Sequence, residues 1–224
     1  MSKALKLIFW ATLIVTLSYA MSGYVSATLQ ADTLRHRANN LISSGKGPDA
    51  LNKDRLELLL LVQDPAFYQH DGVDNKTAGA GLTTVTQSLS KRLAFNHFKP
   101  GIAKLRQTSY ALALERQLSK TEILALFLET IPMGTGPQGW TVGFFEASHA
   151  FYGMAPNDLN TGQYIELVSV MIAPALLSHK TRNKKFTERI NRITRLSNGD
   201  CTPEDNNDVW LAACASQVKP NDGT

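Results

Sequence analysis

The stretch that decides the fold is QDPAFYQHDGVD, residues 63–74. Directly before it, residues 56–62 form an apolar run after a charged turn, and this pattern predicts a buried helix. On both sides of this stretch the chain shows no internal repeat and no sustained alternation of apolar and polar residues. Its 224 residues suffice for one domain with a core of its own. We therefore predict a mainly α-helical fold.

Local signals place the other elements. Ser119 and Glu122 form a capping box, in which a hydroxyl and a carboxylate three residues apart satisfy free backbone N–H groups. Thr202-Pro203 has the pattern of another helix start. Glycines and prolines predict a loop over residues 132–143. Helices are expected over residues 84–95, 102–118, 123–131, 144–151 and 161–177, followed by a basic amphipathic stretch at 182–196.

The N-terminus predicts export. Residues 7–27 are apolar, carry no charge and are long enough to cross a hydrocarbon core of about 30 Å. Lys3 and Lys6 precede this segment and predict a cytoplasmic N-terminus, with the rest of the chain outside. Small residues before Ala20 and Ala27 leave a cleaved signal peptide as the alternative to an uncleaved anchor. Either outcome argues against nucleic acid as a partner.

The only cysteines are Cys201 and Cys214, thirteen residues apart near the C-terminus. In an exported protein such a pair most simply forms a disulfide that closes a small loop, and two free thiols are the alternative. A metal site needs more ligands, and the last histidine of the chain is His179. No metal ligands are assigned.

Charge is unevenly distributed along the chain. The net charge is only +4, yet residues 75–114 contain no Asp or Glu. This acid-free block is either a solvated basic face or a site for an external anion. In an exported protein a phosphorylated lipid suits such a site better than nucleic acid does. Its six cations are Lys76, Lys91, Arg92, Lys99, Lys104 and Arg106.

Four blocks in order carry a family resemblance. Residues 63–74 resemble the first motif of the peptidoglycan glycosyltransferases of family 51, Glu-Asp-x-x-Phe-x-x-His-x-Gly-x-Asp, at every defining position except the first. Residues 81–91, GLTTVTQSLSK, resemble the second motif, Gly-x-Ser-Thr-Ile-Thr-Gln-Gln-Leu-x-Lys. KLRQ at 104–107 stands where the family has Lys-x-x-Glu, and the glycine-rich region that ends in FYG at 151–153 is similar to the family's Tyr-Phe-Gly region.

The resemblance implies a lysozyme-like helical fold at the outer face of the inner membrane, with lipid II as the substrate. In active members the first-motif glutamate deprotonates the acceptor hydroxyl, a second glutamate lies near the diphosphate, and basic side chains hold that leaving group. Whether a divalent metal assists at the diphosphate stays open. The residues that the resemblance assigns to substrate binding are Phe67, His70, Thr84, Thr86, Gln87, Lys91, Lys104 and Arg106.

The departures from the family pattern bear on mechanism. Gln63 replaces the general base, Gln107 the second glutamate, and Gln163 a third glutamate farther along. A glutamine amide keeps the size and the hydrogen bonding but accepts no proton near neutral pH. Losing a positioned base removes about 10²–10⁴-fold in rate. Asp64, beside Gln63, is the carboxylate left to act in its place.

Our leading hypothesis is a catalytically impaired member, a pseudoenzyme, that binds lipid II or another undecaprenyl-diphosphate-linked glycan in cell-wall assembly, with other cell-wall proteins as possible partners. The alternative is an active polymerase that uses Asp64 or a substrate-assisted route. A glycan-cleaving, lysozyme-like enzyme is the third, and it lacks an acid at Gln63. The expected organisation is a cytoplasmic tail at 1–6, a single anchor at 7–27, a polar stalk at 28–47, the glycosyltransferase-like domain at 48–200 and an appendix at 201–224.

Overall fold

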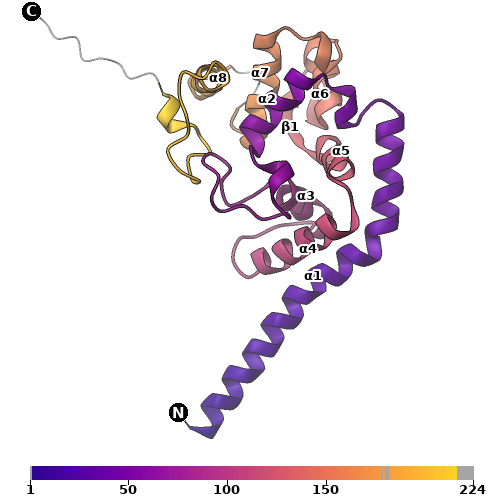
Figure 1. Ribbon diagram of the computed structural model, residues 1–224, viewed down its shortest axis with the longest axis vertical. Helices are drawn as coiled ribbons and strands as arrows, with labels where there is room; N and C mark the ends of the chain where they lie inside the picture. Colours follow the sequence, from indigo (N-terminus) through magenta and orange to yellow (C-terminus); the bar gives the residue numbers. More distant parts are fainter. Residues whose placement is uncertain (1, 178, 180–181, 216–224) are drawn as a thin grey trace, which may run out of the picture. The chain divides into compact units, whose positions relative to one another are not determined.

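The computed structural model describes residues 2–177, 179 and 182–215 (Figure 1). These residues are mainly helical, as the sequence predicts, with one small hairpin. The α-helices are α1 (Lys3–Ser43), α2 (Lys53–Gln63), α3 (Val85–Ala94), α4 (Ala103–Gln117), α5 (Lys120–Thr130), α6 (Phe144–Tyr152), α7 (Thr161–Ser169) and α8 (Lys184–Ser197). The strands are β1 (Pro132–Gly136) and β2 (Gly139–Val142), and short 3-10 helices lie at Pro48–Ala50, Phe67–Gln69, Pro156–Asp158, Val170–Ile172 and Ala212–Cys214.

The chain forms two compact units. Unit 1 consists of Met1–Ala50, Phe67–Val73 and Thr83–Thr130. Unit 2 consists of Leu51–Ala66, Asp74–Leu82 and Ile131–Thr224. Both units therefore contain part of the stretch at residues 63–74.

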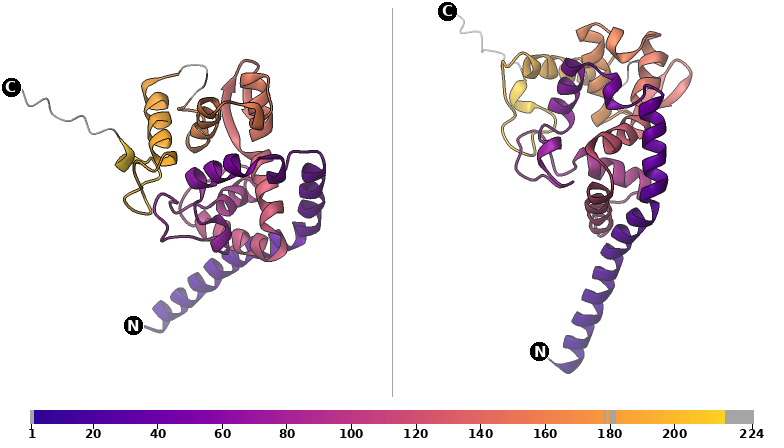
Figure 2. Two further views of the ribbon diagram at one scale, coloured as in Figure 1. Left: turned by 45° about the horizontal axis from the view of Figure 1, so that its top comes forward. Right: turned by 45° about the vertical axis from the view of Figure 1, so that its right-hand side comes forward.

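The second half of α1 belongs to the core of unit 1, where it packs against α4 and α5 (Figures 1 and 2). Its side chains at helical spacing are buried there: Ala27, Ala31, Leu34 and Ala38. Arg37 also pairs with Glu129 of α5 at 2.8 Å. The predicted stalk over residues 28–47 is therefore wrong as far as Ser43, because a stripe of small residues within a polar sequence makes this segment a packed helix.

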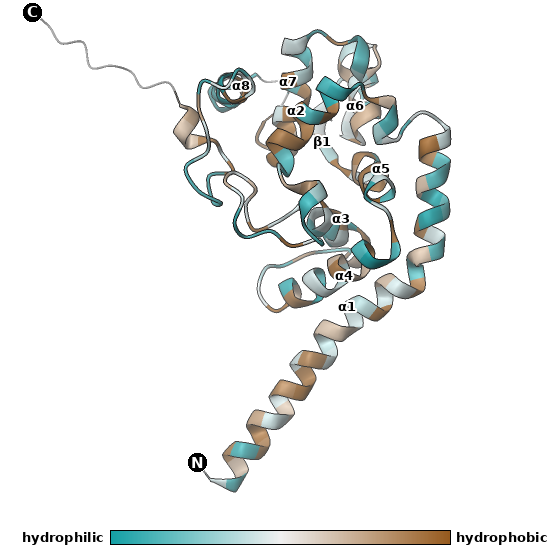
Figure 3. Cartoon of the chain, viewed as in Figure 1, coloured by the Kyte–Doolittle hydropathy of each residue, from teal (hydrophilic) through white to brown (hydrophobic). Residues whose placement is uncertain are grey.

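The first half of α1 is apolar and exposed (Figure 3). Within the described part of the chain, α1 is the one helix long and apolar enough to cross a membrane. Its most apolar 18-residue window has a mean hydropathy of 1.7 and no buried residue. These properties fit the anchor predicted at residues 7–27, and a signal sequence would share them.

The predicted capping box begins α5. The Ser119 hydroxyl accepts a hydrogen bond from the Glu122 N–H at 3.2 Å, and the Glu122 carboxylate accepts one from the Ser119 N–H at 2.7 Å. Two donors at the start of the helix are thus satisfied reciprocally. The helix that follows is buried over six consecutive residues, Ile123–Leu128, and forms the centre of unit 1.

In unit 2, Arg55 joins α2 to α7. Its guanidinium lies 4.6 Å from the centre of the Tyr164 ring and donates to the carbonyl of Leu159, while the Tyr164 hydroxyl donates to the Arg55 carbonyl at 2.7 Å. Gln163 forms a capping box with Asn160 at the start of α7. The side chain at this family-glutamate position therefore has a structural role.

Three local predictions for unit 2 need correction. Residues 132–143 are not a plain loop, because β1 and β2 pair antiparallel with Gly136 opposite Gly139. The helix expected to reach Leu177 ends at Ser169 and continues only as a 3-10 turn. No α-helix starts at Thr202-Pro203 in the described residues, since the chain there turns back toward the expected Cys201–Cys214 disulfide, which is present.

Gly23 tests the packing of α1 on α4. A Cβ at this position would lie 2.3 Å from the Arg106 carbonyl oxygen and 2.6 Å from the Ser109 hydroxyl. Alanine favours the helix by about 1 kcal/mol, but this clash forces the two helices apart. We expect Gly23→Ala to lower the free energy of unfolding by about 1–3 kcal/mol, measured by thermal unfolding in detergent. Ser22→Ala, on the exposed side of α1, is the control and should leave stability unchanged.

Candidate functional site

Gln63 and Asp64 lie at the end of α2, in unit 2. Gln63 is the last helical residue and is half-buried. Asp64 follows as the C-cap: its N–H donates to the Leu60 carbonyl at 2.8 Å, and its side chain is fully buried. The helix end thus presents an amide and, beside it, a buried carboxylate.

Residues 67–73 of the first motif lie in unit 1 and are held there by Lys120. Phe67 is buried, and the Lys120 ammonium lies 4.5 Å from the centre of its ring. The same ammonium donates to the carbonyl of His70 at 2.6 Å. The His70 Nδ1 accepts a hydrogen bond from the Gly72 N–H at 3.0 Å. One cation on α5 therefore fixes the segment that carries the predicted Phe and His.

Glu115 completes this arrangement. Its carboxylate lies 2.8 Å from the Lys120 ammonium, accepts a hydrogen bond from the Thr86 hydroxyl, and is almost wholly buried. A Cβ on Gly72 would lie 2.9 Å from the Glu115 side chain, so glycine is needed for this close approach. Sequence reasoning gave no functional role to Glu115 or Lys120. They pair with each other across five positions, but their further contacts, with Thr86 and His70, are with residues far away in the sequence.

Thr84 sets the start of the second-motif helix α3. Its hydroxyl accepts a hydrogen bond from the Gln87 N–H at 3.1 Å and donates one to the Gly72 carbonyl at 2.8 Å. The first bond is an N-cap. The second ties the first motif to the second within unit 1.

A network of amides links α3 to α4. The Gln107 amide nitrogen donates to the main-chain carbonyl of Gln87 at 2.7 Å. The Gln87 amide donates to the Thr108 hydroxyl and accepts from Lys104, both at 3.2 Å, and Lys104 also donates to the Thr83 hydroxyl at 3.2 Å. Gln107 is buried, and its amide oxygen has no hydrogen-bond partner among the described residues.

Four cations surround this network on α3 and α4. Burial, with the charge of Arg92, lowers the pKa of Lys91. Burial, with the charge of Lys91, lowers the pKa of Lys104. Burial lowers the pKa of Arg92 to about 9. Arg106 lies over the Phe95 ring at 5.2 Å, and its buried Nε has no acceptor within the described chain. Unit 1 thus gathers half-buried positive charges on these two helices, whose one carboxylate, Glu115, is paired with Lys120.

The predicted site residues therefore divide into two groups. Phe67, Thr84 and Thr86 are buried and make structural contacts inside unit 1. Gln87, Gln107 and Lys104 form one connected polar cluster, and the charge of Lys91 acts on Lys104. No group of His, Cys, Asp and Glu suited to a metal ion occurs among the residues that the structure describes.

Comparison with known proteins gives the family. A family model described as "Transglycosylase" matches residues 30–197, three quarters of the chain. The chain belongs to the transglycosylase family. The matched region begins inside α1, in agreement with the packing of that helix on unit 1, and ends with α8.

Curated relatives of this transglycosylase are penicillin-binding proteins. Penicillin-binding protein 1F of Bacillus subtilis is 28% identical over 170 residues, which is 67% of this chain and 23% of the relative. Penicillin-binding protein 1B of Escherichia coli is 30% identical over 181 residues, 71% of this chain and 21% of the relative. The chain thus spans less than a quarter of the length of these relatives.

The glutamine at position 107 of this family member is used as a hydrogen-bond donor. A glutamate at this position would place a carboxylate oxygen against the Gln87 carbonyl, where an N–H group now donates. An ionised carboxylate only accepts hydrogen bonds. The surroundings of position 107 therefore favour an amide over an ionised acid.

We expect Gln107→Glu to lower the free energy of unfolding at neutral pH by about 1–3 kcal/mol, because a buried donor is replaced by an acceptor facing another acceptor. The loss should be smaller near pH 4, where a protonated glutamic acid can donate to the Gln87 carbonyl. Denaturant unfolding at neutral pH and near pH 4 measures this loss of stability. Gln107→Met, which only removes the donor, should show no comparable pH dependence, and the same dependence in both variants would contradict this account.

Proposed function

We propose that this transglycosylase binds lipid II, or another glycan on an undecaprenyl diphosphate, without polymerising it efficiently, and so acts as a binding module in cell-wall assembly. The observation that carries the proposal is the set of cations on α3 and α4 (Lys91, Arg92, Lys104 and Arg106), of which Lys104 is joined through Gln87 to a neutral glutamine at position 107. Glutamine also stands at position 63, where the family 51 pattern has the base.

The chemistry of the cluster supports a diphosphate as ligand. A diphosphate accepts charge-assisted hydrogen bonds from Lys and Arg, and these are stronger than neutral hydrogen bonds. Burial has already removed part of the water around Lys91 and Lys104, so an anion there meets charges that are poorly screened. The buried, unpaired Nε of Arg106 adds a donor.

The place of action in this proposal is the outer face of the cytoplasmic membrane. The apolar half of α1 supports a single membrane anchor, and the Lys3 and Lys6 charges ahead of it support a cytoplasmic N-terminus. A lipid-linked substrate would then diffuse in the same membrane as the anchor. Other cell-wall synthesis proteins are the proposed partners.

An active polymerase is the second candidate function, and the burial of Asp64 favours it. This carboxylate follows Gln63 directly and is shielded from water. A carboxylate can accept a proton, whereas the Gln63 amide cannot. Asp64 would then take the proton that the family's first glutamate takes.

A polymerisation assay decides between these candidates. We expect the full chain to give glycan polymer from labelled lipid II only at background level, because neither glutamine accepts a proton. Gln63→Glu together with Gln107→Glu should raise the rate per folded molecule by about tenfold or more, toward the contribution of a positioned base. Polymer from the wild type that disappears in Asp64→Asn would instead establish the second candidate, and glycan fragments would indicate a cleaving enzyme.

Binding tests the cation cluster directly. We expect the full chain in detergent to bind both lipid II and a short prenyl diphosphate, and Lys91→Ala and Arg106→Ala to weaken each affinity by about tenfold. Lys99→Ala, an exposed cation of the same acid-free block, is the matched control, and Lys76→Ala, outside the motifs, is a second. Both controls should change affinity by less than about twofold. Equal losses in all four variants, or binding abolished by moderate salt, would indicate a diffuse basic face.

The lowered pKa values of the lysines give this binding a pH signature. An anion beside Lys91 and Lys104 favours their charged forms and raises both pKa values again. Binding should therefore take up protons and weaken as pH rises through the lowered pKa of the free protein. Calorimetry in two buffers of different ionisation enthalpy measures that uptake.

A further inference from the structure

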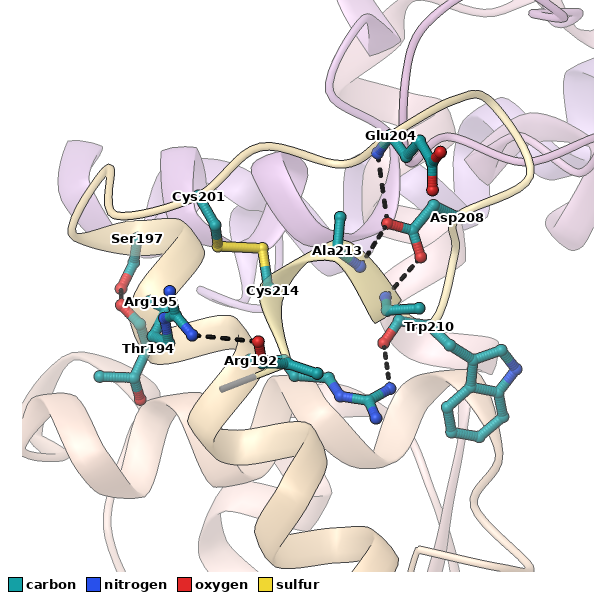
Figure 4. The surroundings of a disulfide bond; sticks show 12 residues. Arg192, Thr194, Arg195, Ser197, Cys201, Glu204, Asp208, Trp210, Ala213 and Cys214 are labelled. Carbon is teal, nitrogen blue, oxygen red and sulfur yellow. Dashed lines mark hydrogen bonds between the residues drawn. A yellow bond between two sulfur atoms is a disulfide. The ribbon is translucent and has the colours of Figure 1, made fainter. Parts of the chain in front are cut away.

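The C-terminal appendix, described here over residues 201–215, lies outside the region that matches the family. The Cys201–Cys214 disulfide closes it, and the Asp208 carboxylate organises its interior by accepting from the N–H groups of Glu204, Ala212 and Ala213 (Figure 4). The appendix is therefore a small closed loop with its own internal contacts, although it contains no α-helix or strand.

Helix α8 holds one side of the appendix. Three arginines spaced three residues apart donate to its main-chain carbonyls: Arg189 to Val209 at 2.9 Å, Arg192 to Trp210 at 3.0 Å, and Arg195 to Ala215 at 3.1 Å. Figure 4 shows the last two of these arginines reaching from α8 toward the appendix. Arg189 is almost fully buried. The basic face of α8 is thus used inside unit 2 to anchor the appendix.

The other side of the appendix contacts residues 77–81, between the first and second motifs. The N–H groups of Gly79 and Gly81 donate to the carbonyls of Asp205 at 2.8 Å and Asn206 at 2.7 Å. The Asn206 side chain donates to the Thr77 carbonyl at 2.9 Å. Three hydrogen bonds therefore tie this segment to the appendix, all within unit 2.

The fit between these two segments is close. A Cβ on Gly79 would lie 2.8 Å from Pro203, and one on Gly81 would lie 2.4 Å from Val209. Both glycines also have positive φ, a conformation that costs other residues free energy. Residues 77–81 carry no charged side chain, so hydrogen bonds and close packing, rather than ion pairs, hold them against residues 201–215.

We propose that the disulfide-closed appendix is a strap that fixes the conformation of residues 77–81 and thereby orders the segment leading into the second motif for its anionic ligand. Residues 77–81 end two positions before Thr83, which already contacts Lys104. Fixing these residues restricts the chain that follows them directly, and a chain that is already ordered loses less conformational entropy when it binds a ligand. The part of this inference that concerns affinity rests on the proposed function, whereas the strap itself does not.

Hydrogen exchange followed by mass spectrometry tests the strap on the full-length protein. In Cys201→Ser/Cys214→Ser the backbone amides of residues 77–81 should exchange about tenfold faster or more, because their acceptors are no longer held in place. Asn206→Ala should give a smaller increase, because it removes only the bond to Thr77. Exchange in α4, which lies in unit 1, should not change in either variant and reports that the fold is intact.

Matched controls separate the strap from general effects of substitution. Asn207→Ala changes the exposed neighbour of Asn206 and should leave exchange in residues 77–81 unaltered. Gly79→Ala should speed exchange, because its methyl group meets Pro203. Gly45→Ala has a similar positive φ, +72° against +77°, but open space around its Cβ, so it controls for backbone strain alone.

The affinity for a short prenyl diphosphate is then measured on the same variants. The proposal expects it to fall by about threefold or more wherever exchange in residues 77–81 rises. Unchanged exchange in the double cysteine variant would refute the strap. Faster exchange together with an unchanged or higher affinity for the prenyl diphosphate would refute the effect of the strap on ligand binding. If the wild type binds no diphosphate, the proposed function fails, and the exchange data alone still decide whether the strap exists.

Discussion

The hydrogen bond from the Gln107 amide to the main-chain oxygen of Gln87 joins the two helices that carry the cations. A carbonyl inside a helix has a second lone pair, and the residue facing it from α4 must therefore supply a donor. Glutamine meets this requirement, whereas an ionised glutamate does not. Once a neutral amide occupies this point, Glu115 is the only carboxylate on α3 and α4, and it is paired with Lys120. The amide at position 107 therefore adds no negative charge next to these cations.

Neutral partners hold these cations in place of carboxylates. Arg92 donates to the hydroxyls of Ser88 and Thr130 and lies 5.0 Å from the centre of the Phe127 ring. Lys104 donates to an amide and a hydroxyl. Such contacts satisfy hydrogen-bonding groups without neutralising charge, which is why burial lowers the pKa of Arg92 so far. The one buried carboxylate in the same unit that faces the motif segments, Glu115, is already paired with Lys120.

Local signals in the sequence predicted much of the fold, because helices depend on contacts a few residues apart. The capping box at Ser119 and the apolar run of α2 were predicted correctly for this reason. The disulfide was predicted because the chain has only two cysteines and an export signal. The packed half of α1 was missed because alanines give little hydropathy signal, although their spacing places them on one face. The β1–β2 hairpin and the Glu115–Lys120 pair were also missed. The hairpin has no alternating pattern. The pair is close in sequence, but the contacts that give it a role, with Thr86 and His70, are long-range and no short motif specifies them.

The replacements at positions 63 and 107 act on the proposed function in the same direction. A polymerase must release the diphosphate after each transfer, and interactions that hold it equally tightly before and during the reaction do not speed the chemistry. Uncompensated cations strengthen the hold on the ground state and slow release, while the missing base slows attack. A strap that fixes residues 77–81 lowers the entropic cost of binding. It changes neither the slow release of the diphosphate nor the slow attack that the missing base causes. These features together suit a chain that retains a lipid-linked glycan better than one that extends it.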